Sequence, residues 1–373
     1  MFRFLHVSDL HLGKAFGSLP EEVRGRLVEA RHEVISRIAD AARARAIDHV
    51  LVAGDLFDTI GPSDAVRRQA AAAMNATGLQ WWIIPGNHDS LAGEELWRRF
   101  DAESSPDVHV LREPAPVEIA PGVVLLPAPL PRQFPGIDLT AWMPGCATPE
   151  GALRIGLAHG GVTDFGEDFD ASAMIPPDRD RSAGLDYLAL GDWHGRRQIG
   201  PRVHYSGTPE QDRFRHGGRG LALAVTIPAR ETPPEVEEVE TGRFHWSEPT
   251  LSLSPGQDVA AALAGLMPAD RLARRDMLMR VRAEGWLRLP ERGALSAAAR
   301  DIAPDFHFFA LDESRLRTEY GAEDLDLIAP SGALRQAAEI LQDEALGNAG
   351  LSEDNQRVAE AALNRLWSLV REE

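Results

Sequence analysis

Residues 2–11 read FRFLHVSDLH, in which the largely apolar run Phe2–Val7 ends abruptly in Ser8-Asp9-Leu10-His11. A run this apolar is typical of a strand buried on both faces of a sheet. A carboxylate and an imidazole placed directly after such a strand lie at the sheet edge where α/β proteins collect their ligands. The stretch therefore predicts an α/β sheet with a polar site beyond the end of its first strand.

The same arrangement recurs along the first 227 residues. Helical patterns at about 21–46 and 63–75 separate the apolar runs, and Ser63 is placed to cap the second helix. Alternating strands and helices predict a layered α/β domain over residues 1–227. The runs that indicate strands are Phe2–Val7, Val50–Ala53, Trp81–Pro85, Val123–Leu126, Ile155–Ala158, Tyr187–Leu190 and Leu221–Ile227.

Beyond residue 227 the pattern changes. The Pro- and Glu-rich stretch 228–240 predicts a linker, and the strand and helix patterns after it indicate a small α+β domain. Two amphipathic helices, at 331–345 and 352–370, follow. We expect a first domain at 1–227, a small α+β capping domain at 228–315 and a C-terminal helical region at 316–373.

Composition excludes several classes of protein. With 39 Lys and Arg against 57 Asp and Glu, the net charge of −18 argues against general affinity for nucleic acid or anionic membranes. Ser8 stands where a P-loop needs its first glycine before Gly13-Lys14, so the chain has no ATPase motif of its own. The single cysteine, Cys146, suits a reducing compartment. Because no apolar run has the length of a membrane span and the N-terminus lacks a signal-peptide pattern, we expect a cytoplasmic protein.

Five consecutive strand ends each carry Asp, Asn or His. Taken singly, each motif has an ordinary explanation as a turn, a helix cap or a histidine satisfied in the core. Together they place carboxylates, imidazoles and an amide at one sheet edge, a mixture that suits Mn²⁺, Fe²⁺ or Zn²⁺. Their lack of cysteine favours an open catalytic site over a structural zinc site. The motifs are Ser8–His11, Gly54–Asp58, Gly86–Asp89, His159-Gly160 and Gly191–His194.

In this order the motifs resemble those of the calcineurin-like metallophosphoesterases over about residues 1–227. Val7–Gly13, Gly54–Asp58 and Tyr205–Pro209 are similar, more narrowly, to the DNA-repair exonuclease branch typified by SbcD. The resemblance implies a four-layer α-β-β-α sandwich with a small capping domain and C-terminal helices. It also implies two metal ions bridged by Asp55, with Asp9, His11 and His194 completing one site and Asn87, His159 and Asp192 the other.

Two positions depart from that branch. Asp192 stands where the branch carries His; as an oxygen ligand it favours Mn²⁺ or Mg²⁺ over Zn²⁺, and the alternative is that it only orients Trp193 or His194. Asp58 replaces a histidine that assists exonuclease action in some relatives, which leaves details of mechanism open. By the same resemblance His88 is the catalytic residue that protonates or stabilises the leaving oxygen, with Asp58 or Asp89 orienting it.

Substrate and partner contacts are less constrained by the sequence. An arginine-rich segment follows the last motif, and it is either a track for a phosphate backbone or a solvated loop paired with acids elsewhere. The acidic loop 163–170 has no assigned role. The C-terminal helices either dock an ATPase partner or close their own core. The segment comprises Arg196, Arg197, Arg202, Arg213, Arg215 and Arg219, with His216.

Three functions follow as hypotheses. The leading one is a Mn²⁺-dependent DNA exonuclease or endonuclease in DNA repair, acting with an SbcC-like ATPase. The alternative within the same superfamily is a phosphodiesterase or phosphatase for nucleotides or cyclic nucleotides. A scaffold that has lost its metals is disfavoured by the near-complete ligand set. Dimerisation is common in the family, and the sequence leaves it open.

Overall fold

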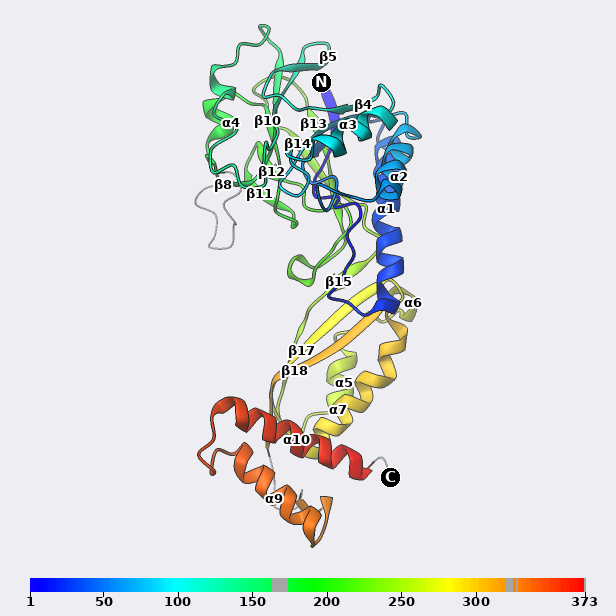
Figure 1. Ribbon diagram of the computed structural model, residues 1–373, viewed down its shortest axis with the longest axis vertical. Helices are drawn as coiled ribbons and strands as arrows, with labels where there is room; N and C mark the ends of the chain where they lie inside the picture. Colours follow the sequence, from blue (N-terminus) through cyan, green and yellow to red (C-terminus); the bar gives the residue numbers. More distant parts are fainter. Residues whose placement is uncertain (163–173, 320–324, 327, 372–373) are drawn as a thin grey trace. The chain divides into compact units, whose positions relative to one another are not determined.

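The computed structural model describes residues 1–162, 174–319, 325–326 and 328–371, and it divides into two compact units, Met1–Trp246 and Ser247–Glu373 (Figure 1). The first unit contains two six-stranded sheets. The second contains a smaller sheet with helices. Within the described residues, no helix combines the length and the apolar composition needed to cross a membrane.

In both sheets of the first unit the central strands run mainly parallel. The first has the order β14-β13-β1-β2-β3-β4, in which β1 to β4 run parallel and β13 runs antiparallel to β1. Its strands are β1 (Phe2–Val7), β2 (His49–Ala53), β3 (Gln80–Ile84), β4 (Val108–Val110), β13 (Leu221–Ile227) and β14 (Glu235–Glu240). The second has the order β11-β12-β10-β7-β6-β5. Its strands are β5 (Val117–Ala120), β6 (Val123–Ala128), β7 (Leu153–His159), β10 (Tyr187–Gly191), β11 (Arg197–Gly200) and β12 (Val203–Tyr205).

Side-chain alternation along the strands builds the layers, because successive residues point to opposite faces. Phe4 of β1 shares a core with Ile155 of β7, and that core lies between the two sheets. Leu5 instead packs with helices α1 (Glu21–Arg43), α2 (Asp64–Asn75) and α3 (Glu94–Glu103). Leu188 of β10 packs outward with Leu185, beside the short helix α4 (Arg179–Ser182). Figure 1 shows α1, α2 and α3 on one side of this unit and α4 on the other, which confirms the α-β-β-α order.

The strands that decide this fold are those the sequence predicts. All seven apolar runs form strands, namely β1, β2, β3, β6, β7, β10 and β13, and both expected helices occur as α1 and α2. Ser63 caps α2 as expected, since its side chain accepts a hydrogen bond from the backbone N of Val66 at 3.3 Å. Short edge strands such as β4 and β5, and helix α3, lack a comparably strong local pattern.

The stretch 228–240, predicted to be a linker, contains β14 instead. This strand pairs antiparallel with β13, with Val236 opposite Val225. Val239 is buried on one face of the sheet, Val236 is partly buried on the other, and the neighbouring glutamates are exposed, so β14 is a mostly exposed edge strand. The linker prediction is therefore wrong, and the first unit extends to Trp246.

In the second unit β16 (Thr250–Leu253), β17 (Met277–Arg288) and β18 (Phe308–Glu319) run parallel. Helices α5 (Val259–Ala264) and α7 (Leu289–Ile302) pack on them through a core that includes Val281 and Leu295. Helices α9 (Ala333–Ala345) and α10 (Glu353–Arg371) follow. Shorter elements of the chain are β8 (Gly161–Val162), β9 (Met174–Ile175), β15 (His245–Ser247), α6 (Arg271–Arg274), η1 (Met143–Gly145), η2 (Phe214–His216) and η3 (Ala303–Asp305).

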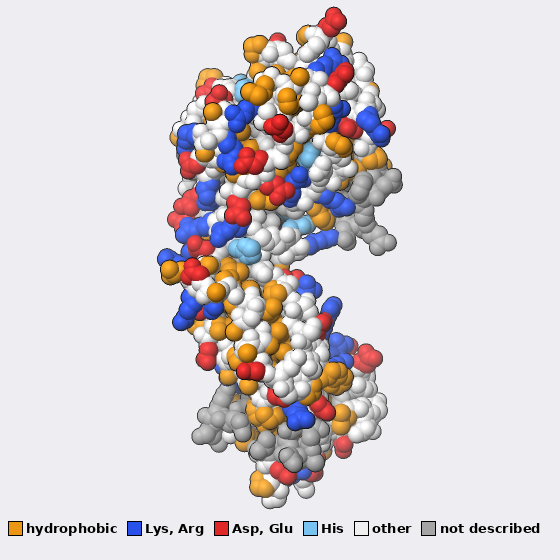
Figure 2. Space-filling view, turned by 180° about the vertical axis from the view of Figure 1, so that it is seen from behind, with side chains coloured by type: hydrophobic (Ala, Val, Ile, Leu, Met, Phe, Trp, Pro, Cys, Tyr) orange, Lys and Arg blue, Asp and Glu red, His pale blue; other side chains and the backbone are white. Residues whose placement is uncertain are grey.

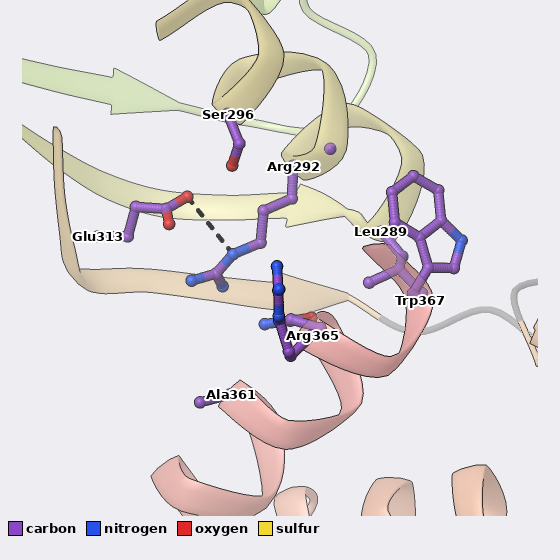
Figure 3. Close-up of a pocket in the computed structure, with 9 residues that line it drawn as sticks. Leu289, Arg292, Ser296, Glu313, Ala361, Arg365 and Trp367 are labelled. Carbon is purple, nitrogen blue, oxygen red and sulfur yellow. Dashed lines mark ion pairs between the residues drawn. The ribbon is translucent and has the colours of Figure 1, made fainter. Parts of the chain in front are cut away.

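Helix α10 shares a small core with α7. Trp367 of α10 packs with Leu289 (Figure 3). A Cβ added at Gly293 would lie 2.2 Å from the indole, so any larger residue there would force Trp367 to move. The same residues border a cavity of about 240 Å³, in which Arg292 Nε lies 3.5 Å from Glu313 Oε1. At least part of α10 therefore closes the core of the second unit.

Candidate metal centre

The predicted ligands lie where the carboxyl ends of the two sheets meet. Asp9 follows β1, Asp55 follows β2 and Asn87 follows β3, all from the first sheet. His159 ends β7, and Asp192 follows β10, both in the second sheet. Because parallel strands deliver their carboxyl ends to one edge, residues far apart in sequence converge without long loops.

One group of side chains comprises Asp9, His11 and His194, whose candidate ligand atoms all lie within 4.8 Å of one another. The Nε2 atoms of His11 and His194 are 3.2 Å apart. Asp9 Oδ1 lies 4.0 Å from the first of these nitrogens and 3.9 Å from the second. All three side chains are buried, so the group forms a compact and shielded site.

A second group surrounds His159. Its Nε2 atom lies 3.1 Å from Asn87 Oδ1, 3.5 Å from Asp55 Oδ2 and 3.7 Å from Asp192 Oδ1. The same Asp55 oxygen lies 3.6 Å from His11 Nε2. Asp55 thus stands between the two groups, in the place the sequence analysis gives to a bridging carboxylate.

The partners of the imidazole Nδ1 atoms indicate which kind of ligand the Nε2 atoms of the site suit. Each of the three has its Nδ1 atom beside an acceptor: His11 beside Asp58 Oδ1 at 3.2 Å, His194 beside Asp212 Oδ1 at 3.0 Å and His159 beside the carbonyl oxygen of Ala53 at 2.8 Å. For His194 and His159 these acceptors require a proton on Nδ1, which leaves a lone pair on Nε2 in the neutral ring. The Nδ1 atom of His11 lies near the Asp58 carboxylate without forming a hydrogen bond among the described residues. The inward-facing Nε2 atoms of His194 and His159 are then acceptors, and acceptors crowded this closely fit divalent cations.

Backbone conformation aims the side chains. Asp9, His11, Asp55 and Asp192 have φ angles of 55°, 43°, 55° and 100°. Non-glycine residues rarely adopt positive φ, and each costs about 1–3 kcal/mol. Such strain concentrates at functional sites, so its presence at four predicted ligands is an independent indication of function.

Two glycines let the loops approach closely. A Cβ added at Gly86 would lie 2.2 Å from Asp55 Oδ1, and one at Gly191 would lie 1.9 Å from the carbonyl oxygen of Ala53. Backbone cannot give way as a flexible side chain can. The glycines of the strand-end motifs are therefore part of what brings the two sheets' ligands together.

The charges at the site are strongly coupled. Burial, together with Asp89 and Asp9, raises the pKa of the Asp55 carboxyl well above its ordinary value. Burial opposes a charge on His159, but Asp55 and Asp192 outweigh it and raise the pKa of His159 to about 9. Without metal, a proton on His159 therefore offsets part of the buried negative charge.

His88 lies at the exposed rim of the site. Its backbone N donates to Asp55 Oδ1 at 2.9 Å, and its Nδ1 atom lies 2.9 Å from the backbone carbonyl of Asp58. The carboxylate of Asp89 accepts instead from the backbone N of Gly86 and of Phe57, at 2.7 and 3.0 Å. Asp58 thus orients His88 through its main chain, while Asp89 joins two loops.

The sequence alone does not predict the buried contacts of Asp212 and Lys14 that hold the histidines. The side chain of Asp212 is fully buried, accepts from His194 Nδ1, and lies 3.2 Å from Lys14 Nζ. Lys14 also lies 3.5 Å from Asp58 Oδ1. The single lysine of the chain therefore connects the two carboxylates that orient His11 and His194. The nearest signal was that Asp212 is one of only two acids within the arginine-rich segment.

The arginine-rich segment separates into two sets. Arg196 pairs with Glu238, Arg202 donates to the carbonyl of Glu231, and Arg219 donates to that of Arg243. Arg197 and Arg215 lie 5.5 and 5.4 Å from the ring centre of Trp193, and Arg213 reaches His194. Only this second set lies beside the predicted ligands. The acidic loop 163–170 falls within residues that the structure does not describe.

The charged side chains on the surface are mixed in sign. On the face that Figure 2 shows, acidic and basic side chains of the described residues are interspersed. Extended basic surfaces are the usual electrostatic footprint of tight nucleic-acid binding. Any attraction for a polyanion on this face must therefore be local.

Comparison with known proteins agrees with this geometry. The pattern that defines the calcineurin-like phosphoesterases matches residues 2–194, and the chain belongs to this family. The chain is 27% identical over 237 residues to the metallophosphoesterase YhaO of Bacillus subtilis, covering 58% of this chain and 55% of that protein. It is thus a member of a family of metal-dependent hydrolases.

Two further relatives carry nuclease or repair names. The SbcD component of the nuclease SbcCD of Rhodobacter capsulatus is 28% identical over 339 residues, covering 76% of this chain and 78% of that one. The DNA double-strand break repair protein Mre11 of Thermoplasma acidophilum is 28% identical over 233 residues, covering 55% and 56%. The chain spans about half the length of YhaO and of this Mre11.

Proposed function

We propose that this protein is a phosphodiester hydrolase that cleaves DNA with two divalent metal ions, of which Mn²⁺ is the best candidate. The observation that carries the proposal is the convergence of the Nε2 atoms of His11 and His159 on Asp55 Oδ2, at 3.6 and 3.5 Å. Oxygen-rich ligand sets suit Mn²⁺ and Mg²⁺, with Fe²⁺ and Zn²⁺ as alternatives. The proposed ligands are Asp9, His11, Asp55, Asn87, His159, Asp192 and His194.

The reaction needs relief of charge, because nucleophile and phosphodiester are both anionic. Two divalent ions held by these residues would supply it, by neutralising charge on the phosphate and lowering the pKa of water toward neutrality. Asp58 and Asp212 hold His11 and His194 in the orientation that presents their Nε2 atoms. His88, exposed at the rim and oriented by the Asp58 carbonyl, gives a proton to the leaving oxygen.

DNA as the substrate is supported by the names of the relatives and by the additional second unit. These 373 residues contain no P-loop, and the proposal therefore includes an SbcC-like ATPase as the partner. Apolar side chains exposed on and beside α9 and α10 support docking of such a partner there: Leu334, Ile340, Leu346 and Val358. Roles in DNA repair and in the cytoplasm, and dimerisation, stay predictions.

A small phosphodiester, such as a nucleotide or cyclic nucleotide, is the second candidate substrate. The net charge of −18 and the interspersed surface favour it, since neither attracts a long polyanion. A scaffold without metal is disfavoured because it has no need for a buried cluster of carboxylates and imidazoles at strained backbone positions.

One assay separates these candidates. Labelled single- and double-stranded DNA, bis(p-nitrophenyl) phosphate and a nucleotide panel are incubated with the full chain while Mn²⁺ is titrated, with and without the candidate ATPase. We expect Mn²⁺-dependent DNA cleavage that Asp55→Asn abolishes. Rapid turnover of small esters with no DNA cleavage under any condition would overturn the nuclease proposal and leave the phosphoesterase.

A further inference from the structure

Arg213 contacts two residues of the site, Asp212 and His194, and has no role in the proposed chemistry. Its Nε atom donates to Asp212 Oδ1 at 3.0 Å, and its Nη2 atom lies 3.3 Å from His194 Nε2. The side chain is 44% exposed, whereas that of Asp212 is fully buried. The guanidinium therefore links the buried Asp212 carboxylate to His194, a member of the cluster formed by Asp9, His11 and His194, while part of the side chain stays exposed to solvent.

The Asp212 carboxylate fixes one edge of the Arg213 guanidinium. Nη2 also lies 3.4 Å from Asp212 Oδ2, so Nε and Nη2 both face the carboxylate. Asp212 is itself held by His194 Nδ1 and Lys14 Nζ. A guanidinium tied in this way loses little further freedom when a second anion arrives.

In the hydrogen bond between Arg213 and His194, donor and acceptor can be assigned. Because His194 Nδ1 faces Asp212, its Nε2 atom is the acceptor, and Arg213 Nη2 is the donor. When that lone pair is used for coordination, the Nη2 hydrogen that faces His194 loses its acceptor, while Nε and the other Nη2 hydrogen keep the Asp212 carboxylate. A donor is then left at the rim of the metal centre with no internal acceptor.

We propose that Arg213 is a substrate-binding residue whose guanidinium contacts a non-bridging oxygen of the phosphate at the metal centre. Guanidinium suits this task because its planar donors match phosphate oxygens and it keeps its charge at every physiological pH. The inference rests on the proposed phosphoesterase function and adds a residue that selects for the phosphate group itself.

A purely structural role is the competing explanation. In that case Arg213 would only neutralise Asp212, and its loss would disturb His194 and weaken metal binding. Lys14 already contacts the same carboxylate, so Asp212 retains a cationic partner without Arg213. The two explanations therefore differ in whether metal binding or phosphate binding depends on this side chain.

The experiment measures Mn²⁺ binding and inorganic phosphate binding separately by calorimetry, on the full chain. The variants are Arg213→Gln, which keeps polarity without charge, and Arg213→Lys, which keeps charge without the planar donors. Arg202→Gln is the matched control, because it removes the same charge from an arginine that donates to the Glu231 carbonyl. Hydrolysis of bis(p-nitrophenyl) phosphate is measured alongside.

We expect unchanged Mn²⁺ stoichiometry in all variants and phosphate affinity about 10- to 100-fold lower in Arg213→Gln, the usual loss for a hydrogen bond to a charged group. Arg213→Lys should recover only part of it, and Arg202→Gln should match the parent chain. Equal phosphate affinity in Arg213→Gln would overturn the inference, as would loss of Mn²⁺ in that variant. Failure of the parent chain to hydrolyse any phosphodiester would instead overturn the proposed function.

Discussion

The Nε2 atoms of His11 and His194 lie 3.2 Å apart and face each other, although the Nδ1 atom of each imidazole lies beside a carboxylate. When both rings are neutral and carry their proton on Nδ1, the two Nε2 lone pairs repel at this distance unless a cation lies between or beside them. The carboxylates of Asp58 and Asp212, joined through Lys14, keep the rings from turning away. The site is therefore preorganised for metal by a buried network behind its ligands.

Asp212→Asn tests that network. Asparagine keeps the shape but removes the charge that fixes the proton on His194 Nδ1, so we expect Mn²⁺ affinity to fall about 10- to 100-fold. Equilibrium dialysis measures it, with Glu238→Gln as a control that removes an exposed carboxylate from Arg196. Unchanged affinity in Asp212→Asn would show that the network does not support the metal.

His88→Ala separates catalysis from metal binding. His88 is exposed and its ring contacts the Asp58 carbonyl, so its loss should leave the number of bound Mn²⁺ ions unchanged. Turnover should fall about 10²- to 10⁴-fold, the usual contribution of a general acid. His32→Ala on α1 is the control, and turnover equal to that of the parent chain would remove His88 from the mechanism.

We predict that Asp192 sets the preference of the site for one metal over another. Its carboxylate lies 3.7 Å from His159 Nε2, on the same side as Asn87. We expect Asp192→Ala to bind about one Mn²⁺ fewer per chain, and Asp192→His to shift the preference toward Zn²⁺, because imidazole is a softer ligand than carboxylate. Competition between the two metals measures the shift. Full Mn²⁺ stoichiometry in Asp192→Ala would mean that Asp192 only orients its neighbours.

Metal binding should depend on pH. Burial opposes a proton on His159, but Asp55 and Asp192 raise its pKa to about 9, so the metal-free ring is protonated at neutral pH. Coordination needs the unprotonated ring, and metal uptake therefore releases a proton. Apparent Mn²⁺ affinity should rise by about tenfold per pH unit up to about pH 9 and then level off. Titrations in buffers of different ionisation enthalpy measure the released proton; a pH-independent affinity would contradict this assignment.

Local patterns made much of the site predictable from sequence. An apolar run followed by a polar motif places Asp9, Asp55 and His159 without knowledge of the fold, because parallel strands share an edge. Asp212 could not be found in this way, since its contact with His194 joins two loops and has no periodic signal. The positive φ angles of Asp9 and Asp55 likewise follow from tertiary constraints.

The limits of the fold prediction have a similar origin. The central strands are easily recognised because both of their faces are buried, whereas β14 carries only two valines among glutamates, Val236 and Val239, and these pack on opposite faces of the sheet. Its Pro-rich approach then resembles a linker. Pairing with β13, a tertiary interaction, overrides that composition and moves the unit boundary to Trp246.

The central claim, a two-metal centre bridged by Asp55, is tested most directly by counting Mn²⁺ ions per chain in the parent protein and in Asp55→Asn. The account predicts about two bound ions in the parent chain, as expected of a two-metal hydrolase, and loss of at least one in the variant. Less than one ion per chain in the parent protein would contradict it.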